Sequence, residues 1–267
     1  MAVIGGADAY PQFFITKSQT WTPPMAGNVC LHLIGGGGGN RGQNNVYASG
    51  GGGGYCKKNY LAVSPSNNLT IVVGAAGQGS LGNQNNYSGG TAGGNTTVAG
   101  SGISSTLTAN GGALGAQGTN GAGGTAANGD VNNTGGAGGD SGGGAVGIYG
   151  TGEAGKSTQY FGQNGGGLSD AGGGGLGMSS FGVICGGARS GTSWWLRDAA
   201  FNGMPNIMST GEDLCGGGTN TIQYYQCGGN GGIGGGAGSA RSTSSSGNYS
   251  NGGYGGPGIV LIQYLPW

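Results

Sequence analysis

The chain has 267 residues, of which 75 are glycine and 7 are proline, and its 8 basic and 8 acidic side chains give a formal net charge of zero. Glycine at this level is typical of collagen or of low-complexity, disordered chains. Ordinary disorder is excluded, because a chain with so little charge and 8% aromatic residues has too little repulsion to stay solvated without folding. The charge balance also argues against nucleic acid as a partner, and no apolar stretch is long enough to span a membrane.

Residues rich in β-branched and aromatic side chains, bounded by turn residues, predict a series of short strands. We expect these strands at residues 12–21, 29–34, 55–63, 69–73, 95–99, 104–108 and 258–264. Because the last strand follows a long glycine-rich stretch, the two ends of the chain should meet in one small antiparallel β-sheet or sandwich. Almost no α-helix is expected, and only residues 193–201 have a composition suited to one or two helical turns.

Glycine between the strands follows a GGX pattern, as in GGAGGD (135–140), GGNGGIGGG (228–236) and GGYGGPG (252–258). Collagen is excluded because glycine does not occupy every third position without interruption and proline is scarce. In the polyproline II conformation, with three residues per turn, a GGX segment has two bare edges and one edge carrying every X side chain. Its outward-pointing backbone groups need partners, so we predict a bundle of packed polyglycine II helices flanking the sheet.

Four stretches carry a resemblance to a known family. They are ITKSQTWTPPMAGNVCLHLIGGGGGN (15–40), GGGGGYCKKNYLAVSPSNNLTIVVGAAGQG (50–79), GGNTTVAGSGISSTLTANGG (93–112) and GGPGIVLIQY (255–264). Their order of strands and glycine runs resembles the glycine-rich domain of bacteriophage tail fibres and the tip adhesins of T-even-like phages. Residues 113–250 share the glycine-rich character of that family but none of these motifs.

The resemblance implies a polyglycine II scaffold whose loops bind a receptor on the host cell, either an outer-membrane protein or a glycan. It also implies a place in the virion at the tail-fibre tip, beside other tail or fibre proteins and with a homotrimer as one arrangement. No enzyme activity, cofactor or metal is expected. The start MAVIGGADAY has no basic region followed by an apolar core, so we expect no signal peptide and synthesis in the host cytoplasm.

We expect one compact unit with four parts. Residues 1–11 would form a docking segment and residues 12–112 a frame of strands with the first glycine runs. Residues 113–257 would form the polyglycine II bundle with aromatic loops, and residues 258–267 the closing strand.

Segments with large side chains interrupt the glycine runs between residues 146 and 227, and we expect them as loops at the ends of the bundle. Tyr and Trp dominate recognition surfaces, because they supply rigid contact area at low entropic cost. The candidate receptor-binding residues are Tyr149, Tyr160, Phe161, Trp194, Trp195, Arg197, Phe201, Tyr224 and Tyr225. The adjacent aromatic pairs could instead cap the ends of the bundle, and both interpretations stay open.

Two other functions are compatible with the same scaffold. The first is a purely structural virion protein, such as a fibre spacer or a capsid decoration. The second is an ice-binding protein, which would need a flat and regular array of Thr or Ala at the X positions. Those positions mix Asn, Asp, Ala, Ile and Tyr, which disfavours ice binding.

Motifs that resemble catalytic or cofactor sites carry little weight in this sequence. GTGEAGKS (150–157) matches the phosphate-binding P-loop, but the glycines at 162 and 165–167 exclude the helix that must follow it. His32 lies within an apolar strand with Cys30 on the same face and Cys56 as the nearest further ligand, so we expect a packed core histidine. The five cysteines have no CxxC spacing and are expected to be buried free thiols.

Overall fold

The structure is a computed structural model. It describes residues 2–4, 11–41, 43–44, 48–81, 88–116, 118–139, 142–144, 146, 150–152, 154–155, 177–178, 184–185, 231, 233–238, 241–242 and 253–266. None of these residues is helical. Residues 193–201, where the sequence allows a short helix, lie outside the described part of the chain.

Two antiparallel sheets organise the described chain. The six-stranded sheet has, from edge to edge, β1 (Ala2–Ile4), β2 (Gln12–Ile15), β17 (Ile259–Tyr264), β4 (Gly27–Ile34), β6 (Tyr55–Val63) and β13 (Val131–Asn133). The five-stranded sheet has β12 (Ala126–Ala127), β11 (Leu107–Ala109), β10 (Thr96–Gly100), β7 (Leu69–Val72) and β3 (Gln19–Trp21). Short pairs are formed by β5 (Gln43–Asn44) with β16 (Arg241–Ser242), β8 (Ser80–Leu81) with β9 (Ser88–Gly89), and β14 (Gly177–Met178) with β15 (Ile184–Cys185).

The closing strand β17 lies in the middle of the six-stranded sheet, between β2 and β4. Its register pairs Leu261 with Phe14 on one side and with His32 on the other. The prediction that both ends of the chain meet in one sheet is therefore confirmed.

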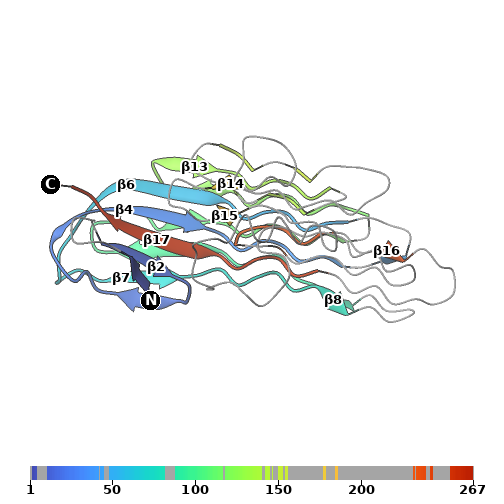
Figure 1. The fold of residues 1–267 in the computed structure, drawn as a ribbon, viewed down its shortest axis with the longest axis horizontal. Helices are drawn as coiled ribbons and strands as arrows, with labels where there is room; N and C mark the ends of the chain where they lie inside the picture. The colour runs from blue at the N-terminus through green and yellow to red at the C-terminus, as the bar shows by residue number, and fades with distance from the viewer. Residues whose placement is uncertain are drawn as a thin grey trace.

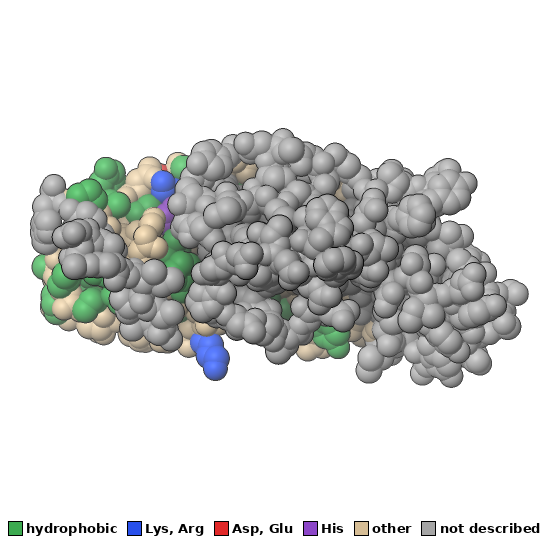
Figure 2. Space-filling model, viewed as in Figure 1, with side chains coloured by type: hydrophobic (Ala, Val, Ile, Leu, Met, Phe, Trp, Pro, Cys, Tyr) green, Lys and Arg blue, Asp and Glu red, His purple; other side chains and the backbone are tan. Residues whose placement is uncertain are grey.

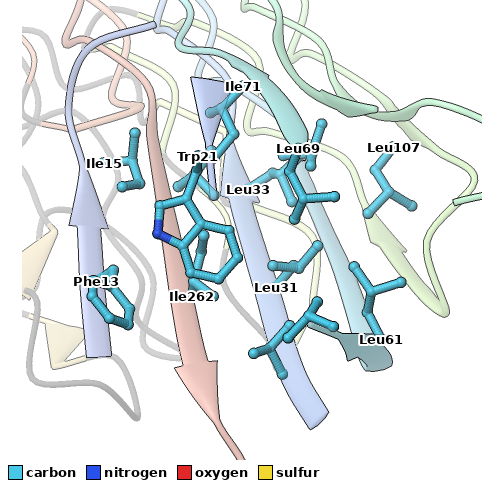
Figure 3. Close-up of a cluster of buried hydrophobic side chains, with 14 of the residues drawn as sticks. Phe13, Ile15, Trp21, Leu31, Leu33, Leu61, Leu69, Ile71, Leu107 and Ile262 are labelled. Atoms are coloured by element: carbon cyan, nitrogen blue, oxygen red, sulfur yellow. The ribbon is translucent and has the colours of Figure 1, made fainter. Parts of the chain in front are cut away.

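Side chains of both sheets fill one hydrophobic core, so the sheets pack face to face as a sandwich (Figure 3). Alternation along β4 directs Leu31 and Leu33 into this core, to which the opposite sheet contributes Leu69. Phe13 of β2 meets Trp21 of β3 edge to face, with ring centroids 5.6 Å apart. Each such buried side chain contributes about 1.5–3 kcal/mol, which offsets the entropy of ordering so many glycines.

Three features of the strands correct or extend the expectations. Residues 12–21 form two strands in different sheets, because the chain crosses the sandwich between them; at Ser18 the hydroxyl accepts a hydrogen bond from the amide of Val73, the residue after β7, at 2.9 Å. β1, which lies within the expected docking segment 1–11, pairs with β2 at the edge of the six-stranded sheet. The boundary at residue 112 does not separate frame from bundle, because β12 and β13 follow it and belong to the sandwich.

Glycine-rich segments extend from one end of the sandwich and make the molecule elongated (Figure 1). The first and last strands, β1 and β17, both belong to the sandwich, whereas β8 and β16 lie near the opposite end. We call this opposite end the distal end. The glycine segments are joined by backbone hydrogen bonds outside any strand.

Residues 35–40, which follow β4, donate backbone hydrogen bonds to three neighbouring segments in turn, so that every third residue bonds to the same segment. The donor–acceptor pairs are Gly35–Gly54, Gly36–Gly94, Gly37–Gly256, Gly38–Gly51, Gly39–Thr91 and Asn40–Gly253, all at 2.8–3.0 Å. Each neighbour therefore recurs after three residues. The carbonyls of this segment accept bonds from three further segments, through Gly112, Gly77 and Ala237, so it has six neighbours.

The returning segment, residues 48–54, is surrounded in the same way. Its amides bond in rotation to the segments around residues 237, 113 and 136, and its carbonyls accept from those around residues 38, 121 and 143. A Cβ on any glycine of 35–39 or 50–54 would lie under 3.0 Å from a neighbouring backbone carbonyl. Two uninterrupted runs of five glycines are therefore required where a segment is surrounded on all sides.

Segments at the surface of the bundle keep the GGX pattern. In residues 121–125, Ala122 and Thr125 are exposed, whereas Gly121 and Gly124 are buried. In residues 253–258 the exposed positions are Tyr254 and Pro257, and the glycines are buried. The X side chain therefore points to solvent wherever a segment has no neighbour on that side.

Candidate functional site

The nine residues selected from the sequence as receptor contacts all lie outside the described part of the chain. They are Tyr149, Tyr160, Phe161, Trp194, Trp195, Arg197, Phe201, Tyr224 and Tyr225. Their assignment, and the choice between receptor contact and capping, therefore stays a prediction.

The distal end brings together parts of the chain that sequence reasoning did not single out. β5 pairs in parallel with β16, in the register Gln43 with Arg241 and Ser242 with Asn44. Near it, Asn40 forms a parallel bridge with Gly115. A sequence signal was present, because residues 40–49 interrupt two runs of five glycines that the fold requires to run side by side.

Three polar residues, Asn40, Arg41 and Ser49, lie in the segments near this distal end. Asn40 is 1% exposed and Ser49 is fully buried. The Asn40 Nδ2 donates to the Gly238 carbonyl at 2.6 Å, and the Ser49 amide donates to Asn120 Oδ1 at 3.3 Å. One side-chain atom of each residue is buried without a hydrogen-bond partner: Asn40 Oδ1, Arg41 Nε and Ser49 Oγ.

His32 is a buried histidine of the sheet, as predicted. Its Nδ1 lies 2.7 Å from the Tyr55 hydroxyl, and its Nε2 lies 3.1 Å from Gln263 Oε1 and 3.3 Å from the Cys30 sulfur. Burial, reinforced by the nearby positive charge of Lys57, lowers the pKa of His32 to about 4, so the ring is neutral at physiological pH. The sheet thus holds His32 as a neutral hydrogen-bonding group.

Burial also controls the two described cysteines, Cys30 and Cys56, which are buried free thiols as predicted. Desolvation raises the pKa of Cys56 to about 11 and raises that of Cys30 as well, so both are protonated and unreactive near neutral pH. The part of the chain that the structure describes contains no group of three His, Cys, Asp or Glu side chains suited to a metal ion.

The P-loop-like motif at 150–157 has a structural explanation in its described residues. The Gly152 and Gly155 amides donate to the carbonyls of Thr134 and Ala137, both at 2.8 Å. These amides bond a neighbouring glycine segment, whereas a phosphate-binding loop keeps such N–H groups free for the ligand.

Charge is sparse on the described surface. Figure 2 shows mainly hydrophobic and uncharged polar side chains on the described part of the face in view, with isolated cationic side chains. The ion pair between Lys58 and Asp130, 2.8 Å long, lies on the sandwich with each side chain about a third exposed to solvent. Within the described ranges, no helix is long and apolar enough to cross a bilayer.

The fold and the distal end define a β-sandwich that carries a cross-bonded glycine bundle. A family model described as "Glycine-rich domain" matches residues 15–265. The chain therefore belongs to this family of glycine-rich domains. A comparison with curated proteins finds no significant match.

Proposed function

We propose that this chain is a receptor-binding adhesin at the tip of a bacteriophage tail fibre. The observation that carries the proposal is the polarity of the molecule: the sandwich contains both the first and the last strand, and the glycine segments run from it to a distal end. Attachment to the virion through the sandwich would leave the distal end free to meet a host cell. The partners are then a host outer-membrane protein or glycan and other tail-fibre proteins.

We further propose that the glycine segments are polyglycine II helices. Hydrogen-bond partners that recur after three residues support this, because the polyproline II conformation has three residues per turn. Six neighbours around one segment are what a side-by-side array of such helices requires. A stiff array of this kind lowers the ordering cost of the loops it presents, and several copies on a trimeric fibre would add avidity.

The proposed contacts are the nine aromatic and basic residues between 149 and 225. Two experiments on adsorption of purified full chain to host cells test this assignment. The first replaces Trp194 and Trp195 with Ala, and we expect loss of cell binding with an unchanged melting temperature. Tyr60→Ala is the matched control, because it removes an aromatic that is 70% exposed on the sandwich and should leave adsorption intact.

The second experiment exchanges residues 189–227 for the corresponding segment of a related chain. We expect the range of hosts bound by the chain to change with the segment. Unchanged host range, with both chimeras folded, would favour the purely structural virion protein, such as a fibre spacer, over an adhesin.

One observation supports the ice-binding alternative, which the mixture of X residues in the whole sequence disfavours. Three neighbouring surface segments, 121–125, 134–139 and 150–155, carry only Ala and Thr at their described X positions. The X residues are Ala122, Thr125, Thr134, Ala137, Thr151 and Ala154. Thermal hysteresis of the purified chain tests this function, and a freezing point equal to the melting point would exclude it.

A further inference from the structure

Three asparagines in the described part of the chain are followed directly by glycine: Asn110, Asn120 and Asn128. Asparagine is chemically labile, and it is most labile before glycine, whose backbone no side chain shields. The backbone nitrogen of the glycine attacks the side-chain carbonyl carbon of the asparagine, and the bond from that carbon to its own nitrogen breaks. The proton of the glycine N–H leaves with that nitrogen as ammonia, and water then opens the cyclic imide to aspartate or isoaspartate.

Isoaspartate would be damaging in this fold, because it adds one carbon to the main chain. Asn110 begins a bundle segment in which the hydrogen-bond partners recur after three residues. The Asn110 and Ala113 amides donate to the carbonyls of Thr125 and Ala122, both at 2.8 Å. A longer main chain at residue 110 would put this three-residue pattern out of register.

Hydrogen bonds hold both reacting groups at Asn110. The Gly111 amide donates to Asn95 Oδ1 at 2.9 Å. The Asn110 Nδ2 donates to Thr125 Oγ1 at 2.8 Å. The nitrogen that would attack and the side chain that it would attack are therefore each bonded to a different residue.

The same arrangement recurs at Asn128, in the turn between β12 and β13. The Gly129 amide donates to Asn132 Oδ1 at 3.1 Å, and the Asn132 Nδ2 donates back to the Gly129 carbonyl at 2.7 Å. The Asn128 Nδ2 donates to the Thr106 carbonyl at 2.8 Å. At two separate places, then, the side-chain oxygen of a second asparagine accepts the hydrogen of the attacking amide.

The third pair is held by the backbone. The Gly121 amide donates to the Ser49 carbonyl at 2.8 Å, and the Ser49 amide donates to Asn120 Oδ1 at 3.3 Å. Because a backbone carbonyl accepts from Gly121, replacing a side chain elsewhere leaves this bond in place. Asn120 is therefore an internal reference for the other two pairs.

We propose that Asn110 and Asn128 are latent deamidation sites, at which Asn95 and Asn132 suppress the reaction by accepting the hydrogen of the attacking amide. An amide that donates to a side-chain oxygen must break that bond before its nitrogen can lose the proton and attack. Each such bond should slow the reaction by about fivefold. This protection belongs to the scaffold and holds whether or not the chain is an adhesin.

Long incubation of the full chain in mildly alkaline buffer, followed by peptide mass spectrometry, measures conversion at the three sites. Asn95→Ala should accelerate deamidation of Asn110 by about fivefold and leave the rates at Asn128 and Asn120 unchanged. Asn132→Ala should do the converse, accelerating Asn128 alone. The two variants are thus controls for each other.

Asn95→Asp is the matched control at the first site, because its carboxylate still accepts the Gly111 hydrogen bond and should keep Asn110 at the wild-type rate. An unchanged rate at Asn110 in Asn95→Ala, or at Asn128 in Asn132→Ala, would overturn the proposal. Acceleration at all three sites in either variant would overturn it too, since the substitution would then have loosened the whole fold. In urea the wild-type chain should convert faster at every site, and a rate equal to that of the native chain would show that the fold gives no protection.

Discussion

Gly52 lies at the centre of the glycine bundle and offers a direct test of the packing. A Cβ at this position would collide with the carbonyl of Gly144, so Gly52→Ala must push the segment 142–144 away. Three hydrogen bonds hold that segment: Gly143 to Gly50, Gly136 to Gly144 and Gly236 to Gly143, donor first, at 2.8–2.9 Å.

The expected cost follows from these contacts. Losing three hydrogen bonds at about 1 kcal/mol each, with about 1–3 kcal/mol of overpacking strain, gives a loss of about 4–6 kcal/mol. In a domain of this size the melting temperature should fall by roughly 10 °C.

Gly150→Ala is the matched control for this measurement. No atom lies within 4 Å of a Cβ built on Gly150, so we expect no loss of stability. The free energy of unfolding should rise by up to about 1 kcal/mol, because alanine lowers the conformational entropy of the unfolded chain. Thermal unfolding followed by circular dichroism compares the two variants. Equal melting temperatures for Gly52→Ala and Gly150→Ala would refute the packing that we derive from the backbone contacts.

Three further predictions concern the sandwich and the bundle surface. Folding lowers the pKa of His32 from 6.5 to about 4, so between pH 6.5 and pH 4 only the unfolded chain binds a proton at this residue. The free energy of unfolding should therefore be constant above pH 6.5 and fall by about 3 kcal/mol toward pH 4. His32→Gln should flatten that decline in denaturant titrations, and an unaltered pH profile would contradict the assignment to His32. Ala137→Tyr, at an exposed X position, should change the free energy of unfolding by less than about 0.5 kcal/mol, and a larger loss in urea melts would mean that this position is packed. Cys30 and Cys56 should resist alkylation in the native protein at mildly alkaline pH and react after unfolding; peptide mass spectrometry that finds either modified in the native state would count against the burial described.

Much of the sandwich could be predicted because strand signals are local. The alternation of Val29, Leu31 and Leu33 marks one buried face of β4, and the range 55–63 coincides with β6. The split of residues 12–21 between two sheets could not be predicted from the sequence. Phe13 and Trp21 are both large, apolar and buried, so nothing local assigns their strands to different sheets.

The candidate site was harder to predict than the fold. Aromatic residues drew attention to nine positions between 149 and 225, all of which lie outside the described ranges, whereas the structure shows unpartnered polar atoms in Asn40, Arg41 and Ser49. Nothing in the local sequence indicates that the Asn40 amide would reach Gly238, which lies 198 residues along the chain.

The sequence by itself determined where backbones of this protein can come into contact, because only glycine lacks the Cβ that would hold two of them apart. It also determined which strands have an apolar face to bury. Only the tertiary structure decided which segments become neighbours, since one GGX repeat presents the same donors and acceptors as another. The sandwich makes that choice: pairing β17 between β2 and β4 places Gly258 beside Gly74, and each glycine segment begins from a position that a strand has already defined.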